Sequence, residues 1–248
     1  ILILIASPDL FSKISGYGYA WGYLGGGILF LINALMTLYP STFGLESQSD
    51  AIRWSFLSVS VWWLVFTIHL LITYKDSPSN NQEISKYQKI LQSFNRLINT
   101  FKEISKYKKA FIFLLAFFLY IDGVHTVMYL ASTFAKNLGL DNSSIIIGLI
   151  IVQFVAFPAT IMWSHIGERS GDFFVISFSI ILYIAIILFT TQLSSAIEFY
   201  LMAASVGSVQ GGIQASSRGY FAKIIPQDKA GEFFGLFNTF GKAGAFVG

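Results

Sequence analysis

The feature that most constrains this chain is a series of long apolar segments. Uninterrupted apolar runs occupy residues 16–38, 54–72, 110–134, 145–166, 173–193 and 197–220, with partial runs at 1–6 and 233–248. A run of about 20 apolar residues has the length of a helix that crosses the hydrocarbon core of a bilayer. The chain is 54% hydrophobic and 12% charged, whereas soluble domains carry about 25% charged residues. We therefore predict an all-α polytopic membrane protein surrounded by a lipid bilayer.

The distribution of basic residues predicts how these segments are oriented. If the loop after residue 72 is cytoplasmic, 13 of the 16 lysines and arginines fall on the cytoplasmic side, as the positive-inside rule requires. The long polar stretch 75–109 then divides the chain. We expect residues 1–74 to belong to an N-terminal helical half, 75–109 to form a cytoplasmic linker, and 110–248 to belong to a C-terminal half. Because apolar runs stop at both chain ends, we also expect an internal fragment of a longer protein.

The linker itself has a helical pattern. From Ile84 to Ile104 apolar residues recur every three or four positions, which predicts an amphipathic helix with lysines and an arginine around its polar side. Such a helix lies on a membrane surface or on the cytoplasmic ends of spans, or it simply serves as a solvated linker. No nucleic-acid-binding motif accompanies these basic residues, so we expect no nucleic-acid partner.

Glycines recur every four residues in the first full span. Gly18, Gly22 and Gly26 lie within the run GYGYAWGYLGGG. Small residues at this spacing allow another helix to approach closely. We predict that this face packs against a neighbouring helix, and such a face could also let two helices slide during transport.

The span 110–134 carries a carboxylate at its midpoint. Asp122 and His125 begin a polar stripe that continues at helical spacing through Thr126, Tyr129 and Thr133. Ionisable groups at this depth face a protein interior or a water-filled cavity. Asp122 is therefore a candidate proton-coupling residue with His125 beside it, and the alternative is a polar contact that only fixes helix packing.

Further polar residues interrupt the later spans. The candidates for solute contact or for locking helices together are Gln153, Gln210, Gln214, Arg218, Asn238 and Lys242. Glycines at 207, 211 and 212 predict either close packing or a break in the helix. Between two spans, the short turn 164–172 contains Glu168, Arg169 and Asp172, and these charges could lock neighbouring helix ends and release them when the helices move.

Five segments together resemble the Atg22-like (UMF1) branch of the major facilitator superfamily. They are the glycine run at 16–27 and the segments 120–126, 152–158, 210–218 and 232–237. The resemblance implies twelve helices in two six-helix halves, with this chain running from the end of helix four into helix eleven. The turn 164–172 resembles the superfamily's G-x-L-A-D-R-x-G loop but departs from it at Ser164, Glu168 and Asp172. The resemblance also implies amino-acid efflux, the activity associated with the yeast vacuolar member.

From the residues and the resemblance together, we predict a secondary transporter of a small polar solute. We expect proton coupling, alternating access, a monomer, and a bacterial inner membrane or a vacuolar membrane as its location. The alternative is a non-transporting receptor or scaffold, which would scatter its polar residues into dry pairs rather than gather them around one cavity. We expect no enzyme, because the three histidines lie on different segments with no nucleophile or metal-ligand spacing. Without cysteines there is no thiolate metal site, and nothing indicates a cofactor.

Overall fold

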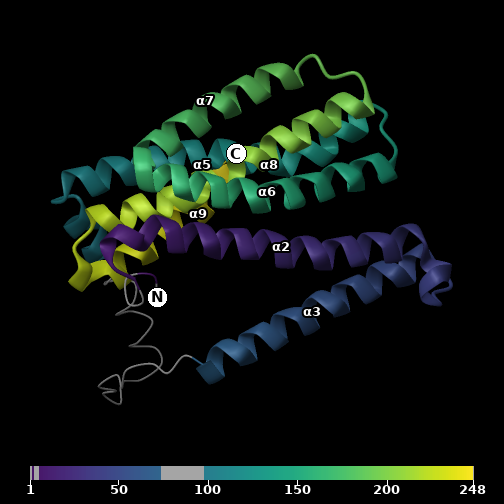
Figure 1. Cartoon of the computed structure of the whole chain (residues 1–248), viewed down its shortest axis with the longest axis horizontal. Coiled ribbons are helices and arrows are strands. Elements are labelled where there is room, and N and C mark those ends of the chain that lie inside the picture. The colour runs from purple at the N-terminus through teal and green to yellow at the C-terminus, as the bar shows by residue number, and fades with distance from the viewer. Residues whose placement is uncertain (1, 3–5, 74–97, 248) are drawn as a thin grey trace. The chain divides into compact units, whose positions relative to one another are not determined.

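The computed structural model describes residues 2, 6–73 and 98–247, and these residues form helices with no strand (Figure 1). The elements in order are η1 (Pro8–Leu10), α2 (Phe11–Leu38), η2 (Pro40–Phe43), α3 (Gln48–Thr73), α5 (Lys108–Asn137), α6 (Asn142–Ser170), α7 (Asp172–Thr190), α8 (Ala196–Ile224), η3 (Gln227–Lys229) and α9 (Ala230–Val247). The predicted all-α fold is confirmed.

Five of the described helices are long and apolar enough to cross a membrane. They are the helices at Pro8–Leu38, Gln48–Thr73, Lys108–Asn137, Asn142–Ser170 and Asp172–Thr190. Helix α8 is different, because its 29 residues give it a length of about 43 Å, yet it is rich in glycine, serine and glutamine. Its buried residues run along most of its length, so α8 is covered by protein and does not need a lipid-facing surface.

The described chain divides into two compact units, residues 1–25 with 93–248 and residues 26–92. In the smaller unit, the second half of α2 and α3 form a helical hairpin. Pro40 starts the short helix η2 after α2 ends, and Gly44 closes the turn with φ of 70°, a left-handed conformation that favours glycine. The Ser58 hydroxyl donates a hydrogen bond to the Asn33 side-chain oxygen at 2.9 Å, which joins the two helices.

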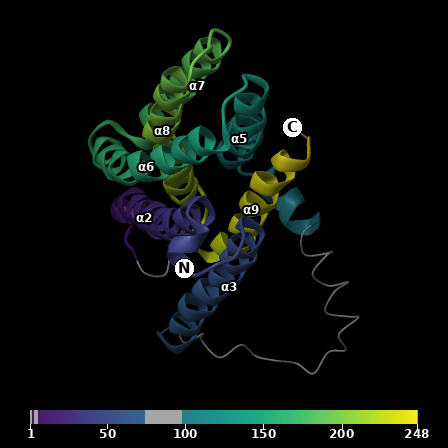
Figure 2. The same ribbon diagram turned by 90° about the vertical axis from the view of Figure 1, so that its right-hand side faces the viewer.

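Helix α8 lies at the centre of the larger unit. Helices α6 and α7 pack against it, and α5 packs on α9 (Figures 1 and 2). The first half of α2 belongs to the same unit and reaches α8, where the Ser15 hydroxyl donates to the Ala215 carbonyl at 3.0 Å.

Glycines on α8 allow α6 to come very close. A Cβ atom added at Gly207 would lie 2.7 Å from the Val152 backbone oxygen, and one added at Gly212 would lie 2.6 Å from the Trp163 ring. A Cβ at Gly211 would overlap the Thr160 side chain. Because α8 continues as one helix through all three glycines, this cluster serves close packing and does not break the helix.

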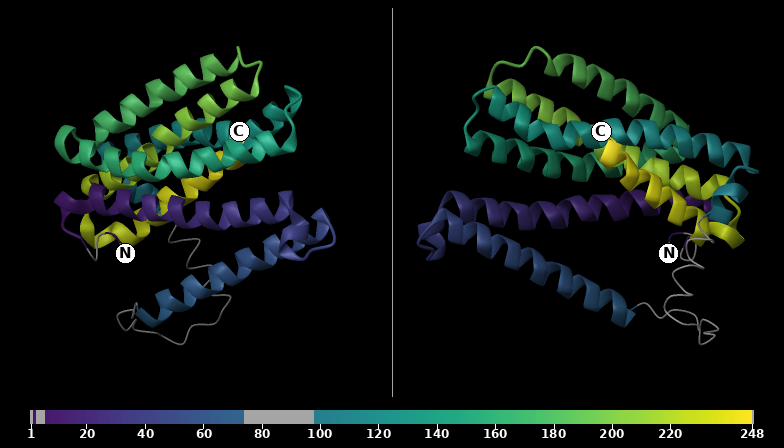
Figure 3. Two further views of the ribbon diagram at one scale, coloured as in Figure 1. Left: turned by 45° about the vertical axis from the view of Figure 1, so that its right-hand side comes forward. Right: turned by 180° about the vertical axis from the view of Figure 1, so that it is seen from behind.

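Aromatic rings hold α5, α8 and α9 together. Phe117 and Phe237 stack with ring centroids 4.0 Å apart, and Phe221 stacks on Phe237 at 4.9 Å. The right-hand view of Figure 3 shows α9 lying against the first part of α5. Large buried rings of this kind dominate the apolar contribution to stability.

Only the last part of the predicted amphipathic linker helix lies within the described residues. Residues 98–104 are helical, and Ile104 is fully buried. Beside it, Lys229 of η3 forms an ion pair with Glu103. The hydrogen bond to the Glu103 carboxylate raises the pKa of Lys229 above its usual value. These contacts attach the end of the linker to the segment that leads into α9.

Candidate functional site

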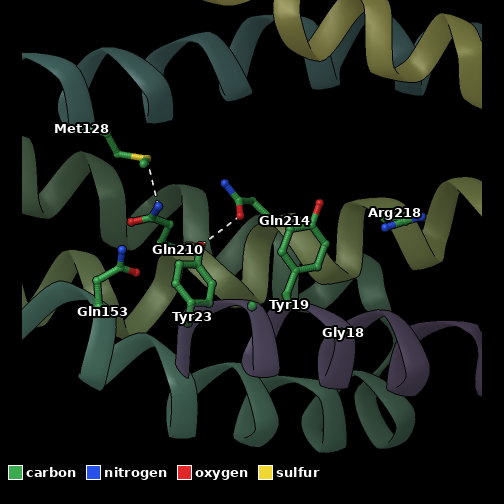
Figure 4. A pocket seen from close by; sticks show the side chains of 9 residues that line it. Gly18, Tyr19, Tyr23, Met128, Gln153, Gln210, Gln214 and Arg218 are labelled. Atoms are coloured by element: carbon green, nitrogen blue, oxygen red, sulfur yellow. Dashed lines mark hydrogen bonds between the residues drawn. The ribbon is translucent and has the colours of Figure 1, made fainter. Parts of the chain in front are cut away.

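A cavity of about 480 Å³ lies between α2, α5, α6 and α8 in the larger unit. This volume is within the usual range for small-molecule sites. Its lining residues are Gly18, Tyr19, Gly22, Tyr23, Met128, Gln153, Gln210, Gln214 and Arg218 (Figure 4). Four of the six residues predicted from sequence as solute-contact candidates are therefore brought together here.

Helix α8 supplies the polar wall of the cavity. Gln210, Gln214 and Arg218 are spaced four residues apart, so they lie on one side of the helix over two turns. Gln210 is only 2% exposed. Its amide nitrogen donates to the Met128 sulfur at 2.9 Å, a weak acceptor, and its amide oxygen has no hydrogen-bond partner among the described residues. The cavity thus contains a buried amide whose hydrogen-bonding capacity is not fully used.

Helix α2 contributes two tyrosines and two glycines to the cavity wall. The Tyr23 hydroxyl donates to the Gln214 side-chain oxygen at 2.9 Å. Gly18 and Gly22 line the cavity, and a Cβ atom added at either one would meet no atom within 4 Å. Among the described residues, these two glycines therefore do not pack against another helix, although the sequence pattern predicted that they would. Gly26, in the smaller unit, likewise has open space around it.

Other glycines of α2 and α8 make the close helix contacts instead. A Cβ at Gly16 would overlap the Ser164 side chain, and one at Gly219 would lie 2.7 Å from the Ser12 hydroxyl. The physical reason is that absent side chains create either a close contact or an empty space. The four-residue repeat alone does not distinguish these two outcomes.

Arg218 is the charged residue of the cavity wall. Figure 4 shows it at one end of the row of lining side chains, and the Tyr19 hydroxyl interacts with its guanidinium group. No carboxylate of the described residues forms an ion pair with Arg218. The site therefore combines a positive charge at one end with amides and phenol groups along its length.

A second polar cluster joins the start of α2, the start of α7 and the end of α8. Asp172 is buried, and its carboxylate accepts hydrogen bonds from the Ser12 hydroxyl at 2.7 Å and from the Lys223 ammonium at 2.8 Å. Lys223 also donates to Ser12 at 2.8 Å. Gly171, with φ of 88°, allows the sharp turn that starts α7 with this aspartate.

The other charged residues of the turn lie nearer the surface. Glu168 forms an ion pair with Lys13 at 3.4 Å, and Arg169 is exposed. Asp172 and Glu168 thus each contact a residue of α2, and Asp172 also contacts Lys223 of α8. The turn between α6 and α7 is therefore bound to both α2 and α8. The sequence had indicated the acids of this turn, but it did not indicate that Ser12 and Lys223 are the partners of Asp172 or that Lys13 is the partner of Glu168.

Asp122 and His125 do not line the cavity. Asp122 is six residues before Met128, a separation that rotates its side chain by about 120° around the helix axis. Both side chains are half-buried, and each has a buried polar atom without a hydrogen-bond partner among the described residues. Thr126, from the same sequence stripe, lines a separate apolar cavity, and Tyr129 is exposed. The stripe does not form one continuous polar surface.

The two polar candidates on α9 also lie apart from the cavity. Asn238 and Lys242 are exposed and are not among its lining residues. Within the described ranges, no group of three or more histidine, aspartate or glutamate side chains could hold a metal ion. The chemistry available in the cavity is hydrogen bonding, stacking on aromatic rings and attraction to one guanidinium group.

Sequence reasoning missed Tyr19, Tyr23 and Met128 as cavity residues. A signal for the tyrosines was present, because they follow Gly18 and Gly22 directly and share their four-residue spacing. A small residue beside a large amphipathic one creates both room and a hydrogen-bonding group. Met128 had no comparable signal, since an apolar side chain in an apolar span is ordinarily a packing residue.

Comparisons with known proteins decide the family. A family model described as vacuole effluxer Atg22 like matches residues 7–248. The chain belongs to the Atg22-like family. Among its relatives is a Bacillus subtilis protein named uncharacterized MFS-type transporter YxiO, which is 34% identical over 248 residues, covering all of this chain and 57% of that protein.

Fungal proteins of the Atg22-like family are more distant relatives. Autophagy-related protein 22 of Yarrowia lipolytica is 27% identical over 96% of this chain and 44% of its own length, and autophagy-related protein 22-1 of Penicillium rubens is 28% identical over 96% and 43%. The chain spans about half the length of the curated relatives that it matches. No solved structure matches it significantly. The resemblance to the Atg22-like branch of the major facilitator superfamily is thus confirmed, for a multi-pass membrane protein.

Proposed function

We propose that this Atg22-like chain is part of a secondary transporter that moves a small polar solute by alternating access. The solute would bind in the cavity between α2, α5, α6 and α8, and the helices on either side would rock about it. Names of the relatives support this class, since they include an MFS-type transporter, and the family model is described as an effluxer.

The observation that carries the proposal is the convergence of polar residues on one cavity. Gln153, Gln210, Gln214 and Arg218 come from two different helices and line the same space. A receptor or scaffold that only kept the fold would bury such residues in dry pairs, since an unsatisfied polar group in hydrocarbon is costly. The cavity therefore favours transport over the scaffold alternative.

We further propose that the Asp172 cluster is a cytoplasmic latch. Its three hydrogen bonds connect the first turn of α2 with α7 and α8, so these helix ends cannot separate while it is intact. The neighbouring pair Lys13 and Glu168 lies at the same end of α2. Opening the cavity toward this end would require these contacts to break.

Proton coupling through Asp122, with His125 beside it, stays a proposal. Each has a buried polar atom without a hydrogen-bond partner among the described residues, and this observation supports the proposal. Asp122→Asn keeps the shape of the side chain and removes its titration. We expect this variant to lose accumulation driven by a pH gradient while solute exchange at equal pH continues, and unchanged pH-driven accumulation would contradict the coupling role.

Solute flux in proteoliposomes containing the full-length protein tests the main proposal. Amino acids are the first class to screen, because the family resemblance implies them. We expect Gln214→Ala, which removes the amide bonded to Tyr23, to reduce exchange, and Ser60→Ala on the exposed side of α3 to have no effect. Failure of the folded wild-type protein to exchange any solute would favour the scaffold alternative.

A further inference from the structure

We infer that the solute carried through this cavity bears a net negative charge and that Arg218 binds its anionic group. The inference rests on the proposed transport function and narrows it to a chemical class. That class is small organic anions with a carboxylate or a similar oxyanion. An acidic amino acid belongs to it, whereas neutral and basic amino acids do not.

The charges of the cavity wall carry the inference. Arg218 is the only charged group among the nine residues that line this cavity, and no described carboxylate pairs with it. The guanidinium group stays protonated at any physiological pH. Arg218 is exposed and has no carboxylate partner among the described residues, so a solute that enters the cavity can reach its guanidinium group. A bound anion would supply that partner, because the planar guanidinium group binds carboxylates through two parallel hydrogen bonds.

Other groups are placed to hold the rest of such a solute. The Tyr19 hydroxyl interacts with the guanidinium group and holds it at one end of the cavity (Figure 4). Toward the other end, Gln210 is 2% exposed, and its amide oxygen has no hydrogen-bond partner in the part of the chain that the structure describes. Two helical turns separate Gln210 from Arg218, a distance of about 12 Å along α8. The cavity thus fits an anion at one end and an uncharged polar group up to about 12 Å away.

The absence of an acidic group among the lining residues gives the selectivity. A cationic solute would face Arg218 with no carboxylate among the described lining residues to compensate, and like charges repel. A neutral solute would leave the guanidinium group unpaired. Both should bind more weakly than an anion of the same size and shape.

Matched pairs of solutes test the inference by counterflow exchange in proteoliposomes with the full-length protein. The pairs are glutamate and glutamine, aspartate and asparagine, and succinate and succinamide, in which the two members differ mainly in charge. In at least one pair, we expect the anion to exchange with at least about tenfold higher apparent affinity than the amide, since charge-assisted hydrogen bonds are about twice as strong as neutral ones.

Substitutions at Arg218 provide the second arm. Arg218→Gln should weaken exchange of the anion by about tenfold or more, as expected for the loss of charge-assisted hydrogen bonds to an exposed guanidinium group. Arg218→Lys should retain part of the affinity. The matched control is Lys136→Gln, which removes one positive charge from an exposed position at the end of α5 outside the cavity, and it should exchange normally. Size-exclusion profiles and thermal stability identify any variant that has not folded. If Arg218→Gln has not folded, Arg218→Lys serves as the test.

The outcomes separate the inference from the proposed function. If amides or lysine exchange as well as the anions, or if folded Arg218→Gln and Arg218→Lys both keep the wild-type affinity for the anion, transport stands and the inference is wrong. If the folded wild-type protein exchanges none of these solutes, neutral, cationic or anionic, the result contradicts both.

Discussion

Breaking the Asp172–Lys223 ion pair should lower the free energy of unfolding, and the effects of substituting the two residues should not be additive. The Asp172 side chain is 1% exposed and the Lys223 side chain is 32% exposed, with 2.8 Å between nitrogen and oxygen. Removing one partner of a fully buried pair costs about 3–5 kcal/mol, because the other charge is left desolvated. Water reaches part of the lysine, so its screening reduces this figure, and we expect a coupling energy of about 1–3 kcal/mol.

A double-mutant cycle measures this coupling directly. Asp172→Asn, Lys223→Gln and the double variant would be prepared in the full-length protein and unfolded reversibly in mixed SDS micelles. The coupling energy is the difference between the effect of the double variant and the summed effects of the single ones. Each single variant should be clearly less stable than the wild type, and the double variant should be less affected than their sum.

The pair Lys13–Glu168 is the control for this cycle. It lies nearby, and its charged nitrogen and oxygen atoms are 3.4 Å apart, but its two side chains are 36% and 25% exposed. Partly exposed pairs contribute about 0–1 kcal/mol, so its cycle should give a coupling energy in that range. If the Asp172–Lys223 coupling is no larger than that of the control, then burial does not strengthen this contact, and the proposed latch loses its physical basis.

Three further predictions concern stability. Gly211→Ala should lower the free energy of unfolding by about 1–3 kcal/mol, because the added Cβ would overlap the Thr160 side chain. An unchanged free energy of unfolding would mean that the alanine has space around it. Tyr120→Phe should cost about 0.5–1.5 kcal/mol, since it removes the hydrogen bond of 2.6 Å to the buried Ser217 hydroxyl; an unchanged stability would mean that this bond does not form. Asp141 caps α6, and hydrogen bonds, chiefly from the Ser144 side chain, lower the pKa of its carboxyl below the ordinary value of 3.8. Its contribution is therefore present at neutral pH and is lost as the pH falls from 3.8 toward the lowered value, and Asp141→Asn should remove that part of the pH dependence of unfolding.

The helices could be predicted from the sequence because their determinants are local. Five of the six full apolar runs lie within one helix, and the run 173–193 extends past the end of α7 at Thr190. The start of a helix is marked by its own capping residues, such as Asp141 before α6 and Ser195 before α8. Length and hydropathy are sufficient for this level of structure. Helix α8 could be recognised as buried because its polar residues and glycines are unsuited to a lipid-facing surface.

The cavity could be predicted only in part. Gln153, Gln210 and Arg218 were found because a polar side chain in an apolar span must face protein or water. Gly22 has open space around it among the described residues, where the glycine repeat predicted a packed helix, because a missing side chain leaves room for either a helix or a solute. The position of Asp122 depends on the rotation of α5 about its axis, which is set by packing against other helices and not by the local sequence.

The latch was the least predictable part. Asp172 lies in a charged turn that the sequence made conspicuous, but Lys223 and Ser12 are 51 and 160 residues away in sequence. Lys223 looked like an ordinary basic residue at the cytoplasmic end of a span. Pairing over such separations follows from how the helices are packed together, and no local pattern encodes it.

The most direct test of the proposal that the solute passes through this cavity is to fill the cavity with a side chain at Gly22. Gly22→Leu adds a large side chain where a Cβ meets no atom within 4 Å, so the protein should fold with stability close to that of the wild type while the solute is excluded. Gly235→Leu is the matched control, because Gly235 also has open space around it but does not line the cavity. Counterflow in proteoliposomes should be lost in the folded Gly22→Leu protein and retained in Gly235→Leu. Normal exchange by Gly22→Leu would show that the solute does not pass through this cavity.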